Sequence, residues 1–155
     1  MIEVTQADFD AAALMKDMQQ RTFGRAGALV SFTGFVRDYA SDASTKSLFL
    51  DYYPGMCERE LATIADQARA RWDVQDARIV HRAGELALGE QIVFVAVASA
   101  HRGDAFAACE FIMDALKTRA PFWKRETLAD GSSFWVEARA SDLQRSQAWD
   151  EEPTK

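Results

Sequence analysis

The chain is organised around two basic runs, Ser-Ala-His-Arg-Gly-Asp-Ala-Phe at 99–106 and Lys-Thr-Arg-Ala-Pro-Phe-Trp-Lys-Arg-Glu at 117–126. An apolar run over 92–100 leads into the first of them and is typical of a strand that is covered on both faces. From Asp104 onward, apolar residues recur at helical spacing, and Pro121 ends the helix because proline has no N–H to donate. The apolar residues expected to face the core are Phe106, Cys109, Met113 and Leu116. The sequence therefore predicts a strand, a turn and a helix with basic residues at both ends.

The two ends of this helix are candidate binding positions. A helix start has free backbone N–H groups and the positive end of the helix dipole, and here His101 and Arg102 stand beside them. The alternative is a solvated turn with two incidental polar residues, since such short motifs occur often by chance. At the far end, Lys117 and Lys124 flank Pro-Phe-Trp, which concentrates cationic and aromatic surface in one place.

Size and composition predict one globular domain. The chain has 155 residues, of which 48% are hydrophobic and 27% charged. We expect a single domain over 1–148 and an acidic, disordered tail over 149–155, because the tail carries Pro153 and no core pattern. The net charge of −6 argues against a general nucleic-acid binder, whereas basic residues bunched at 117–125 favour a small anionic ligand. No apolar run is long enough to span a membrane and no signal-peptide pattern is present, so we expect a cytoplasmic protein.

The two cysteines do not suggest a metal or redox site. Cys57 and Cys109 are far apart in the sequence and have no metal-ligand spacing. Cys109 falls on the apolar side of the predicted helix and is expected in the core. Cys57 is near a predicted helix start, which can lower a thiol pKa, but it has no catalytic partners nearby in sequence and is interpreted as structural.

The remaining pattern predicts an α+β domain, with a mixed or antiparallel sheet on one side and helices packed on it. Thr5 and Asp8 resemble a capping box that opens a helix ending near Gln20. A second helix follows Pro54-Gly55 and has a core stripe of Leu61, Ile64, Ala65, Ala68 and Trp72. The strands are expected at 28–37, 48–53 and 77–81, with a hairpin-like connection at 84–90 and a β-hairpin that pairs 123–128 with 133–138. Gly34 suggests a bulge, and 38–47 a mobile polar loop. A ferredoxin-like arrangement of 48–138 is the alternative.

Six motifs in order give the chain a family resemblance. They are Gly-Ala-Leu-Val-Ser-Phe-Thr-Gly-Phe-Val-Arg (27–37), Asp-Tyr-Tyr-Pro-Gly-Met (51–56), Val-His-Arg-Ala-Gly-Glu-Leu (80–86), Ser-Ala-His-Arg (99–102), Leu-Lys-Thr-Arg-Ala-Pro-Phe-Trp-Lys-Arg-Glu (116–126) and Trp-Val-Glu-Ala-Arg (135–139). Together they resemble the MoaE family, the large, catalytic subunits of molybdopterin synthase. The resemblance covers nearly the whole chain, and its most specific block is Lys-Thr-Arg-Ala-Pro-Phe-Trp-Lys.

The resemblance implies both a fold and a function. The fold is an α/β-hammerhead with a small β-hairpin subdomain, in a homodimer that carries one small ubiquitin-like sulfur-carrier subunit at each end, a heterotetramer overall. The carrier's C-terminal Gly-Gly thiocarboxylate enters the large subunit's pocket. Sulfur passes to cyclic pyranopterin monophosphate in two rounds and builds the dithiolene of molybdopterin. The resemblance implies no metal and no cofactor in the large subunit.

The resemblance also assigns residue roles. The matching catalytic lysines are Lys117 and Lys124. The matching substrate-binding residues are Arg37, His101 and Arg102, with Arg139 reaching in from the other protomer, and the pocket-lining residues Phe32 and Met113. The loop over 38–47 matches a segment that is often mobile in the family.

The chemistry expected of these residues follows from charge. The phosphate of the substrate and the thiocarboxylate of the carrier are both negative, so a hollow lined by basic side chains must hold them together. We expect Lys117 to neutralise the thiocarboxylate and to deliver a proton to the leaving oxygen, provided that burial and neighbouring cations lower its pKa. Lys124 is expected to orient the substrate or the carrier tail.

The sequence allows three further interpretations, one for the pair His81-Arg82 and two for the function of the whole chain. The pair His81-Arg82 is interpreted as structural rather than as a ligand contact. A module that only docks the carrier's tail would need a groove but no lysine pair beside a phosphate site. A nucleotide- or phosphosugar-using enzyme is disfavoured, because no P-loop or GxGxxG motif is present.

Overall fold

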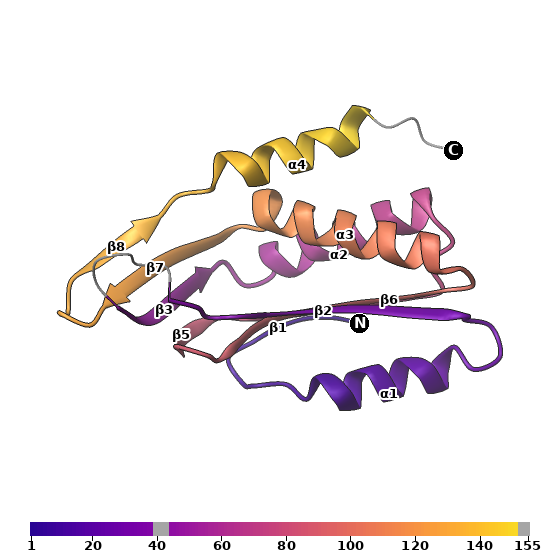
Figure 1. The fold of residues 1–155 in the computed structure, drawn as a ribbon, viewed down its shortest axis with the longest axis horizontal. Helices are drawn as coiled ribbons and strands as arrows, with labels where there is room; N and C mark the ends of the chain where they lie inside the picture. The colour runs from indigo at the N-terminus through magenta and orange to yellow at the C-terminus, as the bar shows by residue number, and fades with distance from the viewer. Residues whose placement is uncertain (39–43, 152–155) are drawn as a thin grey trace.

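The computed structural model describes residues 1–38 and 44–151, which form two four-stranded sheets (Figure 1). The first sheet has the order β1-β4-β6-β2, with β1 (Ile2–Thr5) parallel to β4 (Asp76–Arg82) and with β6 (Gln91–Ser99) and β2 (Ala28–Phe35) antiparallel to their neighbours. The second sheet is antiparallel with the order β5-β3-β7-β8, formed by Gly84–Ala87, Thr45–Tyr52, Phe122–Leu128 and Ser133–Val136. The expected α+β class with mixed and antiparallel sheets is confirmed.

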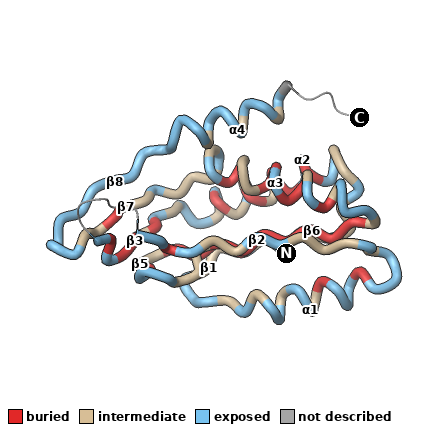
Figure 2. The backbone as a smooth tube through the Cα atoms, in the orientation of Figure 1, coloured by how far each residue is buried: buried red, intermediate tan, exposed pale blue. Residues whose placement is uncertain are grey.

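Helices cover both faces of the first sheet rather than one. Helix α1 (Ala11–Arg21) packs on one face, and α2 (Met56–Arg71) and α3 (Arg102–Arg119) pack on the other (Figure 1). Strand β6 lies between these layers and is buried from Val93 to Ser99, as the continuous apolar run predicted (Figure 2). The prediction that helices pack on one side of the sheet is wrong because α1 covers the other face. There, Met18 of α1 packs on the β6 residues Phe94, Ala96 and Ala98.

The predicted core stripe of α2 is confirmed, whereas that of α3 is partly wrong. The α2 residues Leu61, Ile64, Ala65 and Ala68 are fully buried. On α3, however, Phe106 is 61% exposed. The buried face of α3 contains the expected Cys109 and Leu116, together with Ala105, Ala108, Phe111, Ile112 and Ala115.

The start of the chain differs from the prediction. Thr5 ends strand β1 instead of opening a helix, and it pairs in register with Arg82. The N-cap of α1 is Asp10, whose carboxylate accepts a hydrogen bond from the Ala13 N–H at 3.0 Å. Four residues of strand give too little alternation to be separated from a helix start by sequence alone.

Two expected loops contain strand residues. Residues 45–47, placed in the mobile loop 38–47, begin β3, while 39–43 lie outside the described residues. The expected connection at 84–90 contains β5, which pairs with β3. The bulge expected at Gly34 is confirmed by a register shift between Gly34 and Phe35, where β2 ends.

The hairpin prediction is confirmed, and the ferredoxin-like alternative is wrong. Strands β7 and β8 pair around a turn in which Gly131 has a φ of +87°, a conformation that favours glycine. The strands of 48–138 are divided between two sheets rather than joined in one. The hairpin extends the second sheet next to β3, so it places Lys124 beside the end of α3.

The chain remains helical beyond the expected boundary at 148. Helix α4 (Ala140–Glu151) packs on α3, and its Trp149 contacts the rings of Trp72 and Phe111 at 5.6 and 5.7 Å between centroids. The Trp149 indole N–H also donates to the Asp114 carboxylate at 2.8 Å. The expectation of a disordered tail was therefore wrong for 149–151, while 152–155 lie outside the described residues. The assignment of 1–148 as one domain stays a prediction.

Candidate functional site

An open pocket of about 430 Å³ lies between β2, α3 and α4. Most of its wall is apolar, and its charged groups come mainly from the two helices. Its lining includes Phe32, Phe106, Met113, Lys117, Asp142 and Arg145. Three of the residues expected at the site, Phe32, Met113 and Lys117, therefore share one hollow.

The two α3 carboxylates in the wall of this pocket bind Arg145. Its guanidinium donates to Asp114 at 3.1 Å and to Glu110 at 2.5 Å. Asp114 also accepts from Trp149, so two donors from α4 offset its charge. This ion-pair network fixes α4 against α3 and leaves Lys117 as the basic group at one end of the pocket.

The two expected catalytic lysines lie close together. Lys117 is exposed in the last turn of α3, and Lys124 is partly buried in β7, after the stop at Pro121. The Lys117 ammonium lowers the pKa of Lys124, and both amines act on the buried His81. The proline stop and the following strand therefore return the chain to the end of the helix, as the sequence pattern predicted.

Lys124 has a strongly lowered pKa. Burial lowers its pKa to about 8, with a smaller lowering from Lys117 and Arg139 and an opposing contribution from Asp142. We expected a lowered pKa to be a feature of Lys117. The structure instead provides, at Lys124, an amine that exchanges a proton close to neutral pH.

Replacing Lys124 with methionine is expected to stabilise the folded protein at pH 7. The folded pKa of about 8 lies below the ordinary value of 10.5, so burial of the ammonium destabilises the fold below pH 8. That penalty is relieved as the pH rises from about 8 to 10.5. Allowing for the part of the amine that solvent reaches, we expect about 1–3 kcal/mol more stability at pH 7.

Urea unfolding at pH 7 and at pH 10 measures this effect, since the advantage of Lys124→Met must shrink at the higher pH. Lys46→Met, at an exposed position of β3, is the matched control and should change stability little at either pH. A Lys124→Met protein less stable than wild type at pH 7 would contradict the assigned pKa.

Arg37 is placed at the same end of the fold as the lysines. It follows β2 directly, and β2 and α3 both run antiparallel to β6, so the end of β2 and the end of α3 point the same way (Figure 1). The side chain is exposed. The topology therefore brings Arg37, Phe32 and the lysine pair to one side of the molecule.

His101 and Arg102 do not join this group within one chain, which corrects the expectation of a single hollow. They are exposed at the start of α3, and Arg102 is fifteen residues from Lys117, about 22 Å along a helix axis. Figure 1 shows α3 running from one end of the molecule to the β7–β8 end. Periodicity predicted the helix, but the sequence motif alone did not reveal that its two basic ends are so far apart.

Arg139 lies near Lys124 of its own chain, where its charge adds to the effect of burial and lowers the pKa of that amine. That it reaches the site from the other protomer stays a prediction. Arg139 lies between β8 and α4, because the hairpin returns past β7 before α4 begins. The basic residues near Lys124 in one chain are thus Lys117 and Arg139.

Several residues at the site were missed by sequence reasoning. Asp142 and Arg145 line the pocket from α4, a helix whose weak apolar pattern gave no signal. His81 was interpreted as structural, yet it lies close enough to Lys117 and Lys124 for both to lower its pKa. Its position in a His-Arg dipeptide at a strand end was the only sequence signal.

The cysteines are buried free thiols. Burial raises the pKa of Cys109 to about 11, and it also raises the pKa of Cys57, whose thiol lies 3.3 Å from the Pro121 carbonyl oxygen. Both are therefore unreactive core residues. Across residues 1–38 and 44–151, no three His, Cys, Asp or Glu side chains gather as metal ligands. Within the same ranges, no helix has the length and apolar character needed to cross a bilayer.

Comparison with known proteins identifies one family. A family model described as "MoaE protein" matches residues 4–119. The molybdopterin synthase catalytic subunit of Vibrio cholerae is 48% identical over 149 residues, 96% of this chain and 97% of that protein. The structure of the molybdopterin biosynthesis MoaE protein from Burkholderia ambifaria has a TM-score of 0.82 at 45% identity and covers 98% of this chain and 99% of that one.

A more distant structure shares the fold. It is described as a protein–protein complex of subunits 1 and 2 of molybdopterin-converting factor from Helicobacter pylori. Its TM-score is 0.73 at 20% identity, and the match covers 89% of this chain and 91% of that one. The fold expected from the sequence motifs is thus the fold of these proteins.

Proposed function

Because this chain belongs to the MoaE family, the catalytic subunits of molybdopterin synthase, we propose that Lys117 and Lys124 form the centre at which it transfers sulfur. The reaction is a step of molybdenum-cofactor biosynthesis. Its sulfur donor is the thiocarboxylated C-terminus of a small ubiquitin-like carrier subunit, and its acceptor is cyclic pyranopterin monophosphate. Two rounds of transfer produce the dithiolene of molybdopterin.

The observation that carries this proposal is the lysine pair beside the pocket. Both reactants are anions, and the two amines and the Arg139 guanidinium offset their mutual repulsion. Lys117 lines the pocket together with Phe32 and Met113, which supply apolar surface for the pterin ring. Lys117 neutralises the thiocarboxylate, and the amine of Lys124, with its pKa of about 8, exchanges a proton as the oxygen leaves.

His101 and Arg102 take part from a second copy of the chain. They are too far along α3 to reach the Lys117 of their own chain, yet they combine a helix start with two basic side chains, a suitable pair for a phosphate. In a homodimer with two-fold symmetry, the helix start of each protomer serves the pocket of the other. Arg37 then completes the phosphate contacts from the pocket's own chain.

The proposed compartment is the cytoplasm. Cys57 and Cys109 are both free thiols, the form that a reducing compartment maintains. The thiocarboxylate of the carrier is itself a reduced sulfur group and needs the same protection from oxidation.

Reconstitution tests the proposed function. The purified chain, a thiocarboxylated carrier and the pterin substrate are combined, and the dithiolene product is measured. We expect product only when all three are present, together with binding of the pterin to the chain without its carrier. Carrier binding without pterin binding or product would instead support a module that only docks the carrier's tail.

A further inference from the structure

His81 is a buried residue of β4 near the lysine pair. It is the sixth residue of β4 and lies on the sheet face that α2 and α3 cover, two residues after the fully buried Ile79. Its side chain is 7% exposed. The charges of Lys124 and Lys117 both lower its pKa, so both amines lie close to its ring.

The imidazole has a defined protonation state and tautomer. Its Nδ1 lies 2.8 Å from the Arg82 carbonyl oxygen. Because a carbonyl oxygen only accepts, Nδ1 carries the proton and Nε2 is left with its lone pair. Burial, reinforced by the two lysines, lowers the pKa of His81 to about 4, so the ring is neutral at pH 7.

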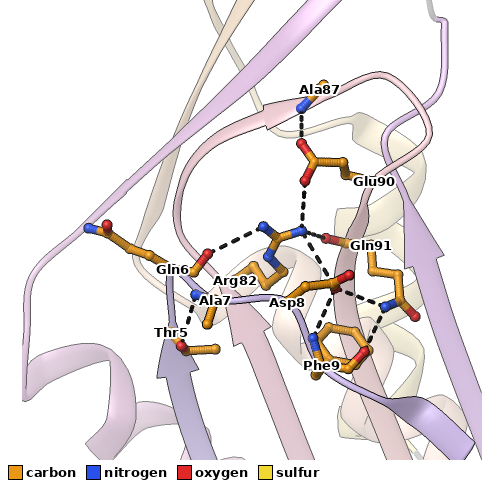
Figure 3. Close-up of polar contacts among 9 residues, drawn as sticks. All are labelled: Thr5, Gln6, Ala7, Asp8, Phe9, Arg82, Ala87, Glu90 and Gln91. Carbon is orange, nitrogen blue, oxygen red and sulfur yellow. Dashed lines mark hydrogen bonds and ion pairs between the residues drawn. The ribbon is translucent and has the colours of Figure 1, made fainter.

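Arg82 anchors the peptide that holds this tautomer. Its buried guanidinium donates to the Gln91 carbonyl oxygen at 3.1 Å, to the Gln6 carbonyl oxygen at 3.3 Å and to the Glu90 carboxylate at 3.3 Å (Figure 3). A further ion pair joins it to Asp8 at 3.7 Å. These contacts tie the end of β4 to the segment after β1 and to the start of β6, so the carbonyl oxygen facing His81 is fixed in place.

The His81 ring also contacts the strand that carries Lys124. It stacks on Phe122, with 3.8 Å between ring centroids and an interplanar angle of 14°. Phe122 and Lys124 are two residues apart in β7, so their side chains emerge on the same face of that strand. The stack therefore fixes the part of β7 from which the Lys124 side chain leaves.

We propose that His81 is a positioning residue for Lys124: its neutral ring excludes water from the Lys124 amine and holds β7 where that amine faces Lys117. An effect of His81 on sulfur transfer rests on the function proposed above, whereas an effect of His81 on the pKa of the Lys124 amine does not. A charged side chain at this position would repel or pair with the lysines, and a small one would admit water. The neutral imidazole can donate a hydrogen bond to the Arg82 carbonyl oxygen. Because it adds no charge, it can also keep the Lys124 amine desolvated.

Besides burial, three charged groups from other parts of the chain act on the Lys124 amine. Lys117 on α3 and Arg139 before α4 lower the pKa of Lys124, and Asp142 on α4 raises it. The neutral His81 on β4 adds no charge and contributes only to burial. Replacing His81 with a smaller neutral residue therefore changes the solvation of the Lys124 amine and leaves the three charges in place.

The test measures the reactivity of the Lys124 amine as a function of pH. The intact protein is treated with a trace of a small acylating reagent, and modification of Lys124 is quantified by peptide mass spectrometry. Only the neutral amine reacts, so the pH dependence of the rate gives its pKa. Because this measurement involves neither the carrier nor the pterin, it stays informative even if the proposed function fails.

His81→Ala is expected to raise the pKa of Lys124 from about 8 toward 10.5. Each unit of increase lowers the labelling rate at pH 7 about tenfold. His81→Phe keeps an aromatic ring on Phe122 and should leave the Lys124 pKa near 8. His81→Asn removes the ring but keeps a hydrogen-bond donor, so it should behave like His81→Ala and replaces that variant if it fails to fold.

Ile79→Ala is the matched control for loss of packing. It removes a fully buried side chain from the same face of β4, so it should lower the urea midpoint of unfolding without moving the Lys124 pKa. The proposal would be overturned if the Lys124 pKa stayed unchanged in folded His81→Ala and His81→Asn. It would also be overturned if the Lys124 pKa rose by the same amount in Ile79→Ala as in the His81 variants. If His81→Ala raises the Lys124 pKa but loss of either lysine leaves activity unchanged, the inference stands and the proposed function is wrong.

Discussion

Replacing Lys117 with alanine is expected to lower dithiolene formation about 100- to 1,000-fold, the range seen when one group that stabilises charge in the transition state is removed. The side chain lines the pocket and is exposed in the last turn of α3, so its removal takes away a reacting group and little packing. The folded structure should persist, because exposed substitutions change stability by about 0.5 kcal/mol or less. Product formation in the reconstituted system and the circular dichroism of the variant measure the two effects.

Two further variants make the Lys117 result specific. Lys16→Ala removes an exposed lysine from α1, a helix on the opposite face of the first sheet, and should react at the wild-type rate. Lys117→Arg keeps the positive charge that neutralises the thiocarboxylate, so it should retain pterin binding and lose less turnover than Lys117→Ala. A Lys117→Ala protein with near wild-type turnover would remove Lys117 from the centre of the reaction.

Mixing two inactive variants is expected to restore activity if the site is shared between protomers. Lys117→Ala and Arg102→Ala should each give a nearly inactive homodimer. In a mixed dimer, one pocket combines the intact Lys117 of one chain with the intact Arg102 of the other. Random exchange makes half of the dimers mixed, each with one intact site of two, so about a quarter of wild-type activity should return.

The control for this experiment mixes Lys117→Ala with Lys124→Ala. Both lysines lie at the same end of one chain, so every pocket keeps at least one defect and no activity should return. Mass spectrometry of differently tagged chains verifies that protomers have exchanged. If exchange is complete and the Lys117→Ala and Arg102→Ala mixture stays inactive, His101 and Arg102 do not complete the partner's pocket.

The sequence predicted best the elements that have a long, regular pattern. Strand β6, helices α2 and α3 and the β7–β8 hairpin were found because periodicity, Pro121 and Asp130-Gly131 are strong local signals. Strands β1 and β5 were missed, since each has four residues and is defined by its partner strand. Helix α4 was missed because much of its attachment comes from Trp149, Arg145 and their partners on α3.

Part of the candidate site was predicted from the sequence, but its arrangement was not. Lys117 and Lys124 were expected together, and they are together because Pro121 reverses the chain. The length of the predicted helix is enough to show that Arg102 and Lys117 are far apart, but the family resemblance assigned both residues to one site. The lowered pKa of Lys124 and its proximity to His81 could not be predicted, because burial depends on how the two sheets meet.

Under the proposed arrangement, the two ends of α3 serve two different pockets, so the length of this helix limits which insertions the protein tolerates. One residue inserted between Arg102 and Lys117 would turn the two ends by about 100° relative to each other and lengthen their separation by about 1.5 Å. The turn at 129–132, by contrast, has an exposed tip that can grow or shrink without altering either end. Natural variants should therefore differ in length at the hairpin tip and keep the residue count of this helix constant.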